Sequence, residues 1–325
     1  MALRVSTDDT RCVLNMLSAL LTSRDMERQG CGPLAWFEVS GEGIDITTVD
    51  RPTVQGTAHL GAGMFEEFEV ESIGFGVNLG HLITCVKLLG ADMNRPDKLA
   101  RMTLCYRVSH NPCLVLHLVE GNTVTECEVR TLEIEPPQPR VLEGDLLARV
   151  VWKSERLKEI IGLLEQGSID GAAKDRALRL QVGVAPPSLS LTVSSTAVGA
   201  EMSFPAQSLV KFAAEGPVDF SYHFSLVASA LRSLKDAEEV LLRVSDDGTI
   251  HWMIKIMDMR DGSHFVDFFL DSLLVDQLEA DEQQPQPCST SNGKRSGDEA
   301  FVDDGPPTDS VRRRLQPMMD GQEGA

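Results

Sequence analysis

The sequence predicts an α+β fold made of two similar halves. A short strand, a polar residue at the junction and an apolar helix occur in residues 75–90 and again in residues 222–235. The same order is found at the start of each half, in residues 3–21 and 148–165. Runs with the pattern of β-hairpins fill the remainder of both halves, so each half is expected to combine strands with helices.

The two halves match well enough to indicate an internal duplication. The segments 3–21 and 148–165 match at a spacing similar to that of three further residue pairs. These pairs share one constant spacing: Phe65 with Phe212, Val77 with Phe224, and Leu79 with Leu226. Two independent matches at nearly the same spacing are typical of a repeated structural unit.

Residues 75–90, "FGVNLGHLITCVKLLG", illustrate how each strand passes into a helix. Phe75 and Val77 alternate with glycines at the period of a strand, and apolar residues then recur at helical spacing from residue 79 onward. Asn78 stands at the junction, where its side chain can accept a hydrogen bond from a backbone N–H of the first helical turn. The helix predicted over residues 79–89 contains Lys87 and no acidic residue.

Three predicted hairpins place glycine-containing turns between apolar or alternating runs. They are "WFEVSGEGIDITTV" (36–49), "LVLHLVEGNTVTECEV" (114–129) and "VLLRVSDDGTIHWMIKI" (240–256). Between the halves, residues 131–144 contain three prolines, which favour an extended connector. We therefore predict a first domain over residues 1–130, the connector over 131–144 and a second domain over 145–275.

The last part of the chain has a different composition. Residues 276–325 are rich in Gln, Pro, Ser, Gly and acids and have few apolar residues, so they are predicted to form a disordered tail. Their eleven acidic residues exceed their five basic residues by six, which leaves −13 of the net charge of −19 in residues 1–275. The predicted folded part is therefore itself acidic.

Composition also limits the class of protein. An acidic chain is not expected to bind nucleic acid through its overall charge, although a few basic residues gathered on one surface are compatible with DNA. No run approaches the ~20 apolar residues of a transmembrane helix, and the N-terminus lacks the apolar core of a secretory signal. Seven scattered cysteines, an odd number, favour a reducing compartment.

Two groups of residues have the chemistry of metal ligands. Clustered carboxylates could serve a nuclease, and the candidates are Glu66, Glu67, Glu69, Glu71, Asp45 and Asp50. Those from Glu67 to Glu71 alternate on a predicted strand and are better explained as its solvent-facing side. A zinc site would need Cys105, His110, Cys113 and His117 together. His110 lies in a predicted turn and Cys105 is not expected near the others, so no metal site is predicted.

The sequence also lacks common catalytic motifs. It has no phosphate-binding glycine loop, nucleophile elbow or HExxH helix. We therefore expect neither catalysis nor a cofactor.

Several segments resemble the DNA sliding clamps. "GVNLGHLITCVKLLG" (76–90) is similar to the second-helix segment of proliferating cell nuclear antigen. "AGMFEEFEV" (62–70) and "MTLCYRVSHNPCLVLHLVEGNTVTECEV" (102–129) resemble the Rad-one type of subunit of the heterotrimeric nine-one-one checkpoint clamp. The resemblance is good over residues 60–130, weaker over 1–60 and 145–275, and absent from the tail. It implies a clamp fold in which helices line a central channel and sheets form the outer wall.

The resemblance gives a reason why helices such as that over residues 79–89 lack acidic residues: DNA phosphates in the channel would repel carboxylates. It implies that lysines and arginines of these helices contact phosphates without reading sequence. The helix near residues 154–165 is mixed, since it also carries Glu155, Glu159 and Glu165. The predicted DNA-facing residues are Arg11, Arg24, Lys87, Lys153, Arg156, Lys158, Arg232 and Lys235.

The resemblance also implies ring closure by edge strands of neighbouring subunits, which we predict at Cys113–Val119 and Val198–Phe204. The predicted interface residues are Cys113, Leu114, Val115, Leu116, His117, Leu118, Val198, Ala200 and Met202. The implied partners are two different homologous clamp subunits, double-stranded DNA without sequence preference, an ATP-driven clamp loader, and repair and checkpoint proteins. The implied location is the nucleus, and no association with a membrane is expected.

The function implied is that of a non-catalytic subunit of a DNA damage checkpoint clamp, which encircles DNA and serves as a platform for signalling and repair proteins. A homotrimeric replicative clamp is one alternative, and the oligomer formed by the purified chain would distinguish it. A metal-dependent 3′–5′ exonuclease is another, for which Mg²⁺-dependent degradation should disappear with Glu67→Gln and Glu69→Gln. A scaffold that never contacts DNA is the third.

Overall fold

The computed structural model describes residues 2–21, 32–51, 53–88, 101–108, 110–166, 176–194, 199–231, 237–256 and 264–273. All of these residues belong to one compact unit, Met1–Asp281. The tail predicted for residues 276–325 lies outside the described residues. Within the described part of the chain, no helix is long and apolar enough to cross a membrane.

The first half begins and ends with strands and contains two α-helices among the described residues. Its elements are β1 (Leu3–Thr7), α1 (Thr10–Ala19), β2 (Leu34–Ser40), β3 (Gly43–Arg51), β4 (Val54–Gly61), the 3-10 helix η1 (Ala62–Met64), β5 (Glu67–Val70), β6 (Ile73–Asn78), α3 (Leu79–Leu88), β7 (Arg101–Arg107), β8 (Cys113–Glu120) and β9 (Thr123–Leu132). The predicted passage from strand to helix at Asn78 is confirmed, and Asn78 Oδ1 accepts a hydrogen bond from the His81 N–H at 2.9 Å.

In the described residues, the second half repeats the same twelve elements in the same order. They are β10 (Leu146–Lys153), α4 (Ser154–Gln166), β11 (Ala177–Val184), β12 (Pro187–Ser194), β13 (Gly199–Pro205), the 3-10 helix η2 (Ala206–Ser208), β14 (Lys211–Ala214), β15 (Val218–His223), α5 (Phe224–Leu231), β16 (Ala237–Ser245), β17 (Ile250–Ile256) and β18 (Phe265–Leu270). Strand pairings repeat as well, since β1 lies between β5 and β7 as β10 lies between β14 and β16. The predicted α+β fold with two similar halves is therefore confirmed.

The residue matching predicted between the halves is displaced, however. β6 and β15 each end directly at a helix, so Leu79 corresponds to Phe224 and not to Leu226. In the same way, Phe212 lies opposite the first strand of its half as Phe68 does, so it does not correspond to Phe65. At Leu79 the displacement is two residues, which preserves the in-and-out alternation of the preceding strand, so the apolar pattern alone could not fix the spacing there. At Phe212 it is three residues, and the match with Phe65 rested on residue type alone.

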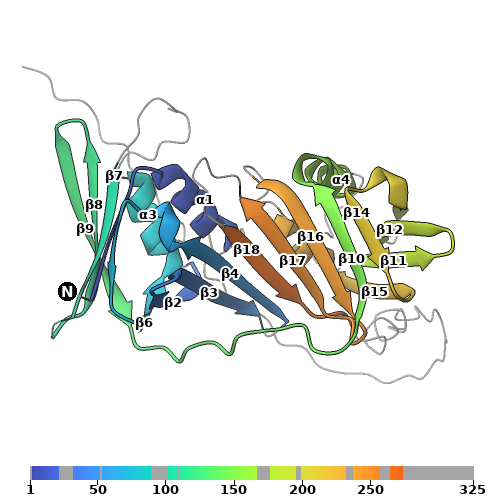
Figure 1. Cartoon of the computed structure of the whole chain (residues 1–325), viewed down its shortest axis with the longest axis horizontal. Helices are drawn as coiled ribbons and strands as arrows, with labels where there is room; N and C mark the ends of the chain where they lie inside the picture. Colours follow the sequence, from blue (N-terminus) through green and yellow to red (C-terminus); the bar gives the residue numbers. More distant parts are fainter. Residues whose placement is uncertain are drawn as a thin grey trace, which may run out of the picture. The chain divides into compact units, whose positions relative to one another are not determined.

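Fourteen strands form one continuous sheet and four form a second one. The orders are β14–β10–β16–β17–β18–β4–β3–β2–β6–β9–β8–β7–β1–β5 and β13–β12–β11–β15. The halves meet where β18 pairs antiparallel with β4, from Phe265 opposite His59 to Leu270 opposite Val54. Figure 1 shows these two strands side by side, in orange and blue. We call this strand pair the seam.

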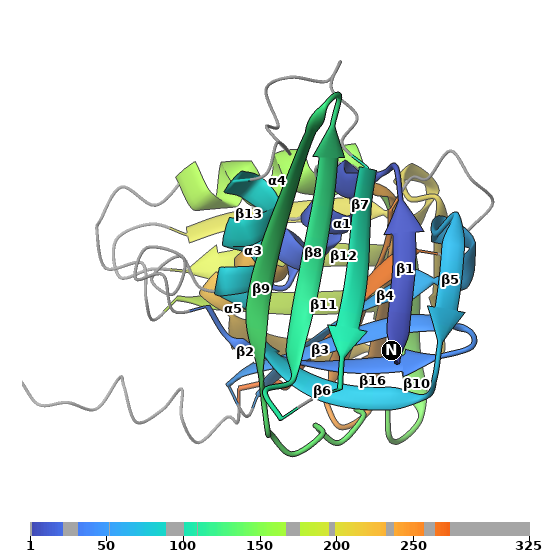
Figure 2. The same ribbon diagram turned by 90° about the vertical axis from the view of Figure 1, so that its left-hand side faces the viewer.

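The helices pack on the core side of the sheets. α1 contacts α3, β4 and β18, whereas α4 contacts α5, β10 and β16. Figure 2 shows α1 and α3 behind the sheet that contains β9, β8, β7, β1 and β5. Beneath them, the ring of Phe75 stacks on Phe37 and on Tyr106, with centroid distances of 5.3 and 4.3 Å. Burial of these aromatic and aliphatic side chains is the main stabilising term of the fold.

A connector without helix or strand, residues 133–145, leads from β9 to β10 and runs past the seam (Figure 1). The side chain of Gln55, on β4, holds it by two hydrogen bonds. Gln55 Nε2 donates to the Gln138 carbonyl and Gln55 Oε1 accepts from the Arg140 N–H, both at 2.9 Å. Arg140 also forms an ion pair with Asp271. The assignment of separate domains on either side of 131–144 stays a prediction.

Candidate nucleic-acid and subunit interfaces

Two of the predicted DNA-facing residues lie on neighbouring helices of the first half. Arg11 is in α1 and Lys87 is in the last turn of α3, and both side chains are exposed. The two helices pack against each other, and neither contains an acidic residue. This pair of helices therefore presents positive charge on the face of the sheets that carries the helices.

The helix α4 carries a more balanced charge. The exposed bases here are Lys153, the last residue of β10, and Arg156 and Lys158 near the start of α4, but they alternate with acids. Arg156 Nη1 lies 3.2 Å from Glu159 Oε2, so part of its charge is compensated within the helix. α4 therefore presents less net positive charge to an anionic ligand than α1 and α3 do.

The remaining predicted bases, Arg24, Arg232 and Lys235, lie outside the described residues. Residues Phe224–Leu231 of α5 include no charged side chain, and all of them except Ser225 are buried. Within the described part of the chain, α5 contributes no basic group to this face.

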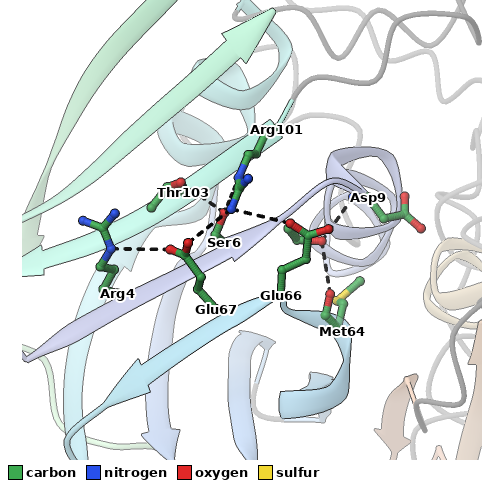
Figure 3. Close-up of polar contacts among 9 residues, drawn as sticks. Arg4, Ser6, Asp9, Met64, Glu66, Glu67, Arg101 and Thr103 are labelled. Atoms are coloured by element: carbon green, nitrogen blue, oxygen red, sulfur yellow. Dashed lines mark hydrogen bonds and ion pairs between the residues drawn. The ribbon is translucent and has the colours of Figure 1, made fainter.

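Two of the acids considered for a nuclease site, Glu66 and Glu67, are held by arginines on the face of the sheet opposite the helices (Figure 3). Arg101 Nη2 lies 3.3 Å from Glu67 Oε1 and 3.5 Å from Glu66 Oε2. Arg4 Nε lies 3.6 Å from Glu67 Oε2. Arg101 Nε also donates to Ser6 Oγ at 2.9 Å, which fixes the guanidinium beside β1. Among the described residues, no group of three or more His, Cys, Asp or Glu side chains could hold a metal ion.

The residues considered for zinc are arranged differently from the prediction in one respect. Cys105 lies opposite Val115, which puts it on the same sheet face as Cys113 and His117. Cys105 is buried, and this burial raises the pKa of its thiol. His117 Nδ1 instead contacts Glu126 Oε2, at 3.3 Å. These side chains therefore belong to a polar strand face and not to a set of metal ligands.

Among the described strands, β9 and β13 each have a side without a strand partner, as do β5, β14 and β15, which pair with one neighbour only. β9 pairs with β8 along its length but with β6 only through Thr131 and Leu132, so Thr123–Arg130 has one side without a strand partner in the described chain. β13 pairs only with β12 and ends its sheet. The second predicted edge, Val198–Phe204, coincides with β13, of which Ala200 and Met202 are half-buried and Val198 lies outside the described residues.

The first predicted edge, Cys113–Val119, is wrong. This segment is β8, which is hydrogen-bonded to β7 on one side and to β9 on the other. Leu114, Val115, Leu116 and Leu118 are each at most 1% exposed, so neither face of the strand is free. Cys113 and His117 are half-buried. A run of residues buried on both faces is the mark of an interior strand, and this signal was present in the sequence.

The seam contains a polar network that the sequence did not reveal. His59, on β4, lies 2.9 Å from Asp45 through Nδ1 and 3.3 Å from Asp267 through Nε2. His251 Nε2 lies 2.9 Å from the second oxygen of Asp267. The ring of Phe265 stacks on His59 with centroids 4.3 Å apart. Four strands from both halves therefore contribute to one network on the face opposite the helices.

The charges of this network depend on one another. Burial lowers the pKa of His59, but hydrogen bonds to Asp267 and Asp45 outweigh that effect and raise the pKa to about 9. Burial raises the pKa of Asp267, but hydrogen bonds to His251 and His59 bring it below its ordinary value. At neutral pH the seam thus holds a cationic His59 between two carboxylates.

Comparison with known proteins agrees with this architecture. Residues 3–256 match the family described as repair protein Rad1/Rec1/Rad17. The human cell cycle checkpoint protein RAD1 is 26% identical over 236 residues, which cover 70% of this chain and 79% of that protein. The Drosophila melanogaster DNA repair protein Rad1 is 21% identical over 248 residues, covering 73% and 85%.

Solved structures show the same fold at low sequence identity. Proliferating cellular nuclear antigen from Entamoeba histolytica superimposes with a TM-score of 0.67 at 16% identity, covering 84% of this chain and 99% of that one. A chain of the PCNA2–PCNA3 complex from Sulfolobus tokodaii gives 0.66 at 14% identity, covering 83% and 98%. The chain has the sliding-clamp fold and belongs to the repair protein Rad1/Rec1/Rad17 family.

Proposed function

We propose that this chain is a non-catalytic subunit of a DNA damage checkpoint clamp. Together with two different homologous subunits it forms a ring that encircles duplex DNA in the nucleus and serves as a platform for checkpoint-signalling and repair proteins. A separate ATP-driven loader places the ring on DNA. The names of the relatives, a cell cycle checkpoint protein in human and a DNA repair protein in Drosophila, support this role.

One observation carries the proposal of a ring: two of the strands with a free edge, β9 and β13, correspond to the two strands of the seam. In the order of elements, β9 takes in the first half the place that β18 takes in the second, and β13 takes the place of β4. β18 and β4 pair with each other inside the chain. A β9–β13 pair between neighbouring subunits would repeat that join, and a head-to-tail contact that repeats with a closing rotation produces a ring.

The charge distribution supports the passage of DNA on the side of the helices. Arg11 and Lys87 lie on that face, whereas the described acids Glu66 and Glu67 lie on the opposite face with their arginines. Because only a few bases contact phosphates, each ring would bind weakly and in a salt-dependent manner, as sliding requires. Such contacts carry no sequence information.

The test compares two charge-reversal variants of the reconstituted ring on nicked circular DNA. Arg11→Glu with Lys87→Glu should lower the number of retained rings, more at low than at high salt, because screening weakens the added repulsion. Arg149→Glu with Lys255→Glu is the matched control, since these exposed bases lie on strands and face away from the helices. Undiminished retention by the helix variant would contradict the assignment of the channel.

A further inference from the structure

Because the fold is repeated, the register in which β9 of one subunit would pair with β13 of another can be inferred from the seam. This step rests on the proposed ring, in which β9 of one subunit pairs with β13 of the next. In an antiparallel pair, residues directly opposite each other have Cβ atoms about 5 Å apart and point to the same face. Their charges therefore decide whether two given edges fit together.

The residue of β18 that corresponds to each residue of β9 is found by following the paired residues from strand to strand. The starting points are β1 and β10, which correspond to each other. Val5 lies opposite Phe68 and Val150 opposite Phe212, which fixes the correspondence of β1 with β10. Continuing across the sheet, Cys127 of β9 takes the position of Phe268 of β18. The successive residues are Val5, Leu104, Leu116 and Cys127 in the first half and Val150, Leu242, Trp252 and Phe268 in the second. Glu126 therefore corresponds to Asp267.

The position of β13 follows in the same way from β6 and β15, which have equal length and end at corresponding helices. Counting across the sheet places Met202 of β13 at the position of Ala58 of β4. The successive residues are Phe75, Phe37, Ile46 and Ala58 in the first half and Phe220, Leu180, Leu191 and Met202 in the second. Glu201 therefore corresponds to Thr57.

In the seam, Asp267 lies directly opposite Thr57. If two copies of this chain joined through β9 and β13 in the same register, Glu126 of one copy would lie directly opposite Glu201 of the other. Two carboxylates in this arrangement repel each other. A partner strand with a basic or neutral residue at the opposed position would not meet this repulsion.

The surroundings of the two acids differ in how far they compensate the charge. Glu126 lies 3.3 Å from His117 and 3.9 Å from Arg107, and Arg107 is shared with Glu128. Glu201 is exposed and accepts a long hydrogen bond from Ser203 Oγ, at 3.5 Å. Glu201 is therefore the cleaner position at which to change the charge of the edge.

We propose that Glu126 and Glu201 are specificity-determining residues of the two edges: they disfavour the joining of two copies of this chain and favour homologous partners whose opposed strands are basic or neutral. Repulsion against the wrong partner is an efficient way to choose among related subunits. It also acts at every join of a homotrimer, because each join would contain the same pair of acids.

The test is a charge-swap cycle on the full chain, with self-association measured by sedimentation velocity. Glu201→Lys should tighten self-association by about tenfold, because an attraction replaces a repulsion at each join. Glu126→Lys should act in the same direction. The double variant places two lysines opposite each other and should return to the level of the original chain. Glu42→Lys makes the same charge change at the exposed turn between β2 and β3 and is the matched control.

Each outcome decides between distinct statements. If Glu201→Lys associates no more than the Glu42→Lys control, the inferred register is wrong. If the original chain alone forms a stable trimer, the acids do not exclude self-assembly and the inference also fails. The proposed clamp function fails separately, when the ring reconstituted with its partners retains no DNA although the charge-swap cycle behaves as expected.

Discussion

Across the seam, the opposing strand brings a cation to an acid, since His59 of β4 contacts Asp267 of β18 at 3.3 Å. At the free edges, the inferred register would bring an acid to an acid, Glu201 to Glu126. The two strands of the seam, β4 and β18, are thus complementary in charge, as strands that pair within one chain must be. The edges β9 and β13 are not complementary to each other in this register, which suits the proposed assembly with different homologous chains.

The two kinds of join also differ in their apolar side. Phe268 of β18 is 0% exposed and lies against β4 at Gly56, where an added Cβ would meet the ring at 2.8 Å. The corresponding residue of β9, Cys127, is only half-buried. The apolar side of the seam is therefore fully buried in the core, whereas β9 keeps partly exposed apolar surface that a partner strand can cover.

Truncation of Phe268 should break the seam and have the largest effect. Phe268→Ala removes a fully buried aromatic ring and leaves a cavity, so the free energy of unfolding should fall by about 3–5 kcal/mol. Cys127→Ala at the corresponding edge position should cost less than about 1 kcal/mol, because the side chain is smaller and half-buried. Urea unfolding monitored by circular dichroism measures both, and similar losses would contradict the distinction.

The charge of His59 should make the seam sensitive to alkaline pH. The pKa of His59 is raised from 6.5 to about 9 in the folded chain, so its stabilising contribution is complete below about pH 6.5 and is lost as the pH rises through 9. The loss should be at most about 3 kcal/mol. The protonated imidazole of His59 contacts both Asp45 and Asp267, and Asp267 also contacts His251.

The measurement is the free energy of unfolding in urea at pH 6.5 and at pH 9.5. His59→Gln should remove most of the difference between the two values. His117→Gln, which alters the half-buried histidine beside Glu126 near the edge, is the control and should keep the difference. A pH dependence that His59→Gln leaves unchanged would mean that another group titrates.

Local features of the fold were predictable because they depend on neighbouring residues. The change of apolar period at Asn78 predicted the end of β6 and the start of α3, and both are confirmed. The hairpins over residues 36–49, 114–129 and 240–256 are confirmed in the same way. Turn chemistry and periodicity act within a few residues, so one sequence is sufficient to read them.

The order of strands in a sheet is not local, and there the prediction was less successful. β8 was predicted as an edge, although its run of Leu114, Val115 and Leu116 has the continuous apolar character of an interior strand. The alternation of Thr125, Glu126 and Cys127 in β9 is better suited to an edge, because charged residues protect unpaired strands. This comparison was available in the sequence.

The seam network had no local signal at all. His59 and Asp267 are separated by more than two hundred residues, and each occurs in an ordinary alternating strand. Only the pairing of β4 with β18 brings them together. For the helices, the structure places Arg11 and Lys87 on neighbouring elements, and their contact with DNA stays a prediction.

Removal of the hydrogen bonds of Gln55 tests the difference between the seam and the edge strand β13 with the smallest expected effect. Gln55 is 5% exposed and its amide holds the connector at Gln138 and Arg140, whereas the inferred correspondence puts a glycine, Gly199, at this position of β13. Gln55→Ala removes one hydrogen bond as donor and one as acceptor, so the free energy of unfolding should fall by about 1–2 kcal/mol.

The same substitution should loosen the connector, which limited proteolysis can detect. Trypsin should cleave after Arg140 faster in Gln55→Ala than in the original chain, because the backbone there loses its anchor to β4. Thr57→Val is the matched control: it removes the 3.2 Å hydrogen bond between the Thr57 and Thr47 hydroxyls on the same face of β4 and leaves the connector held. Equal cleavage rates at Arg140 in all three proteins would mean that the ion pair of Arg140 with Asp271 holds the connector without Gln55.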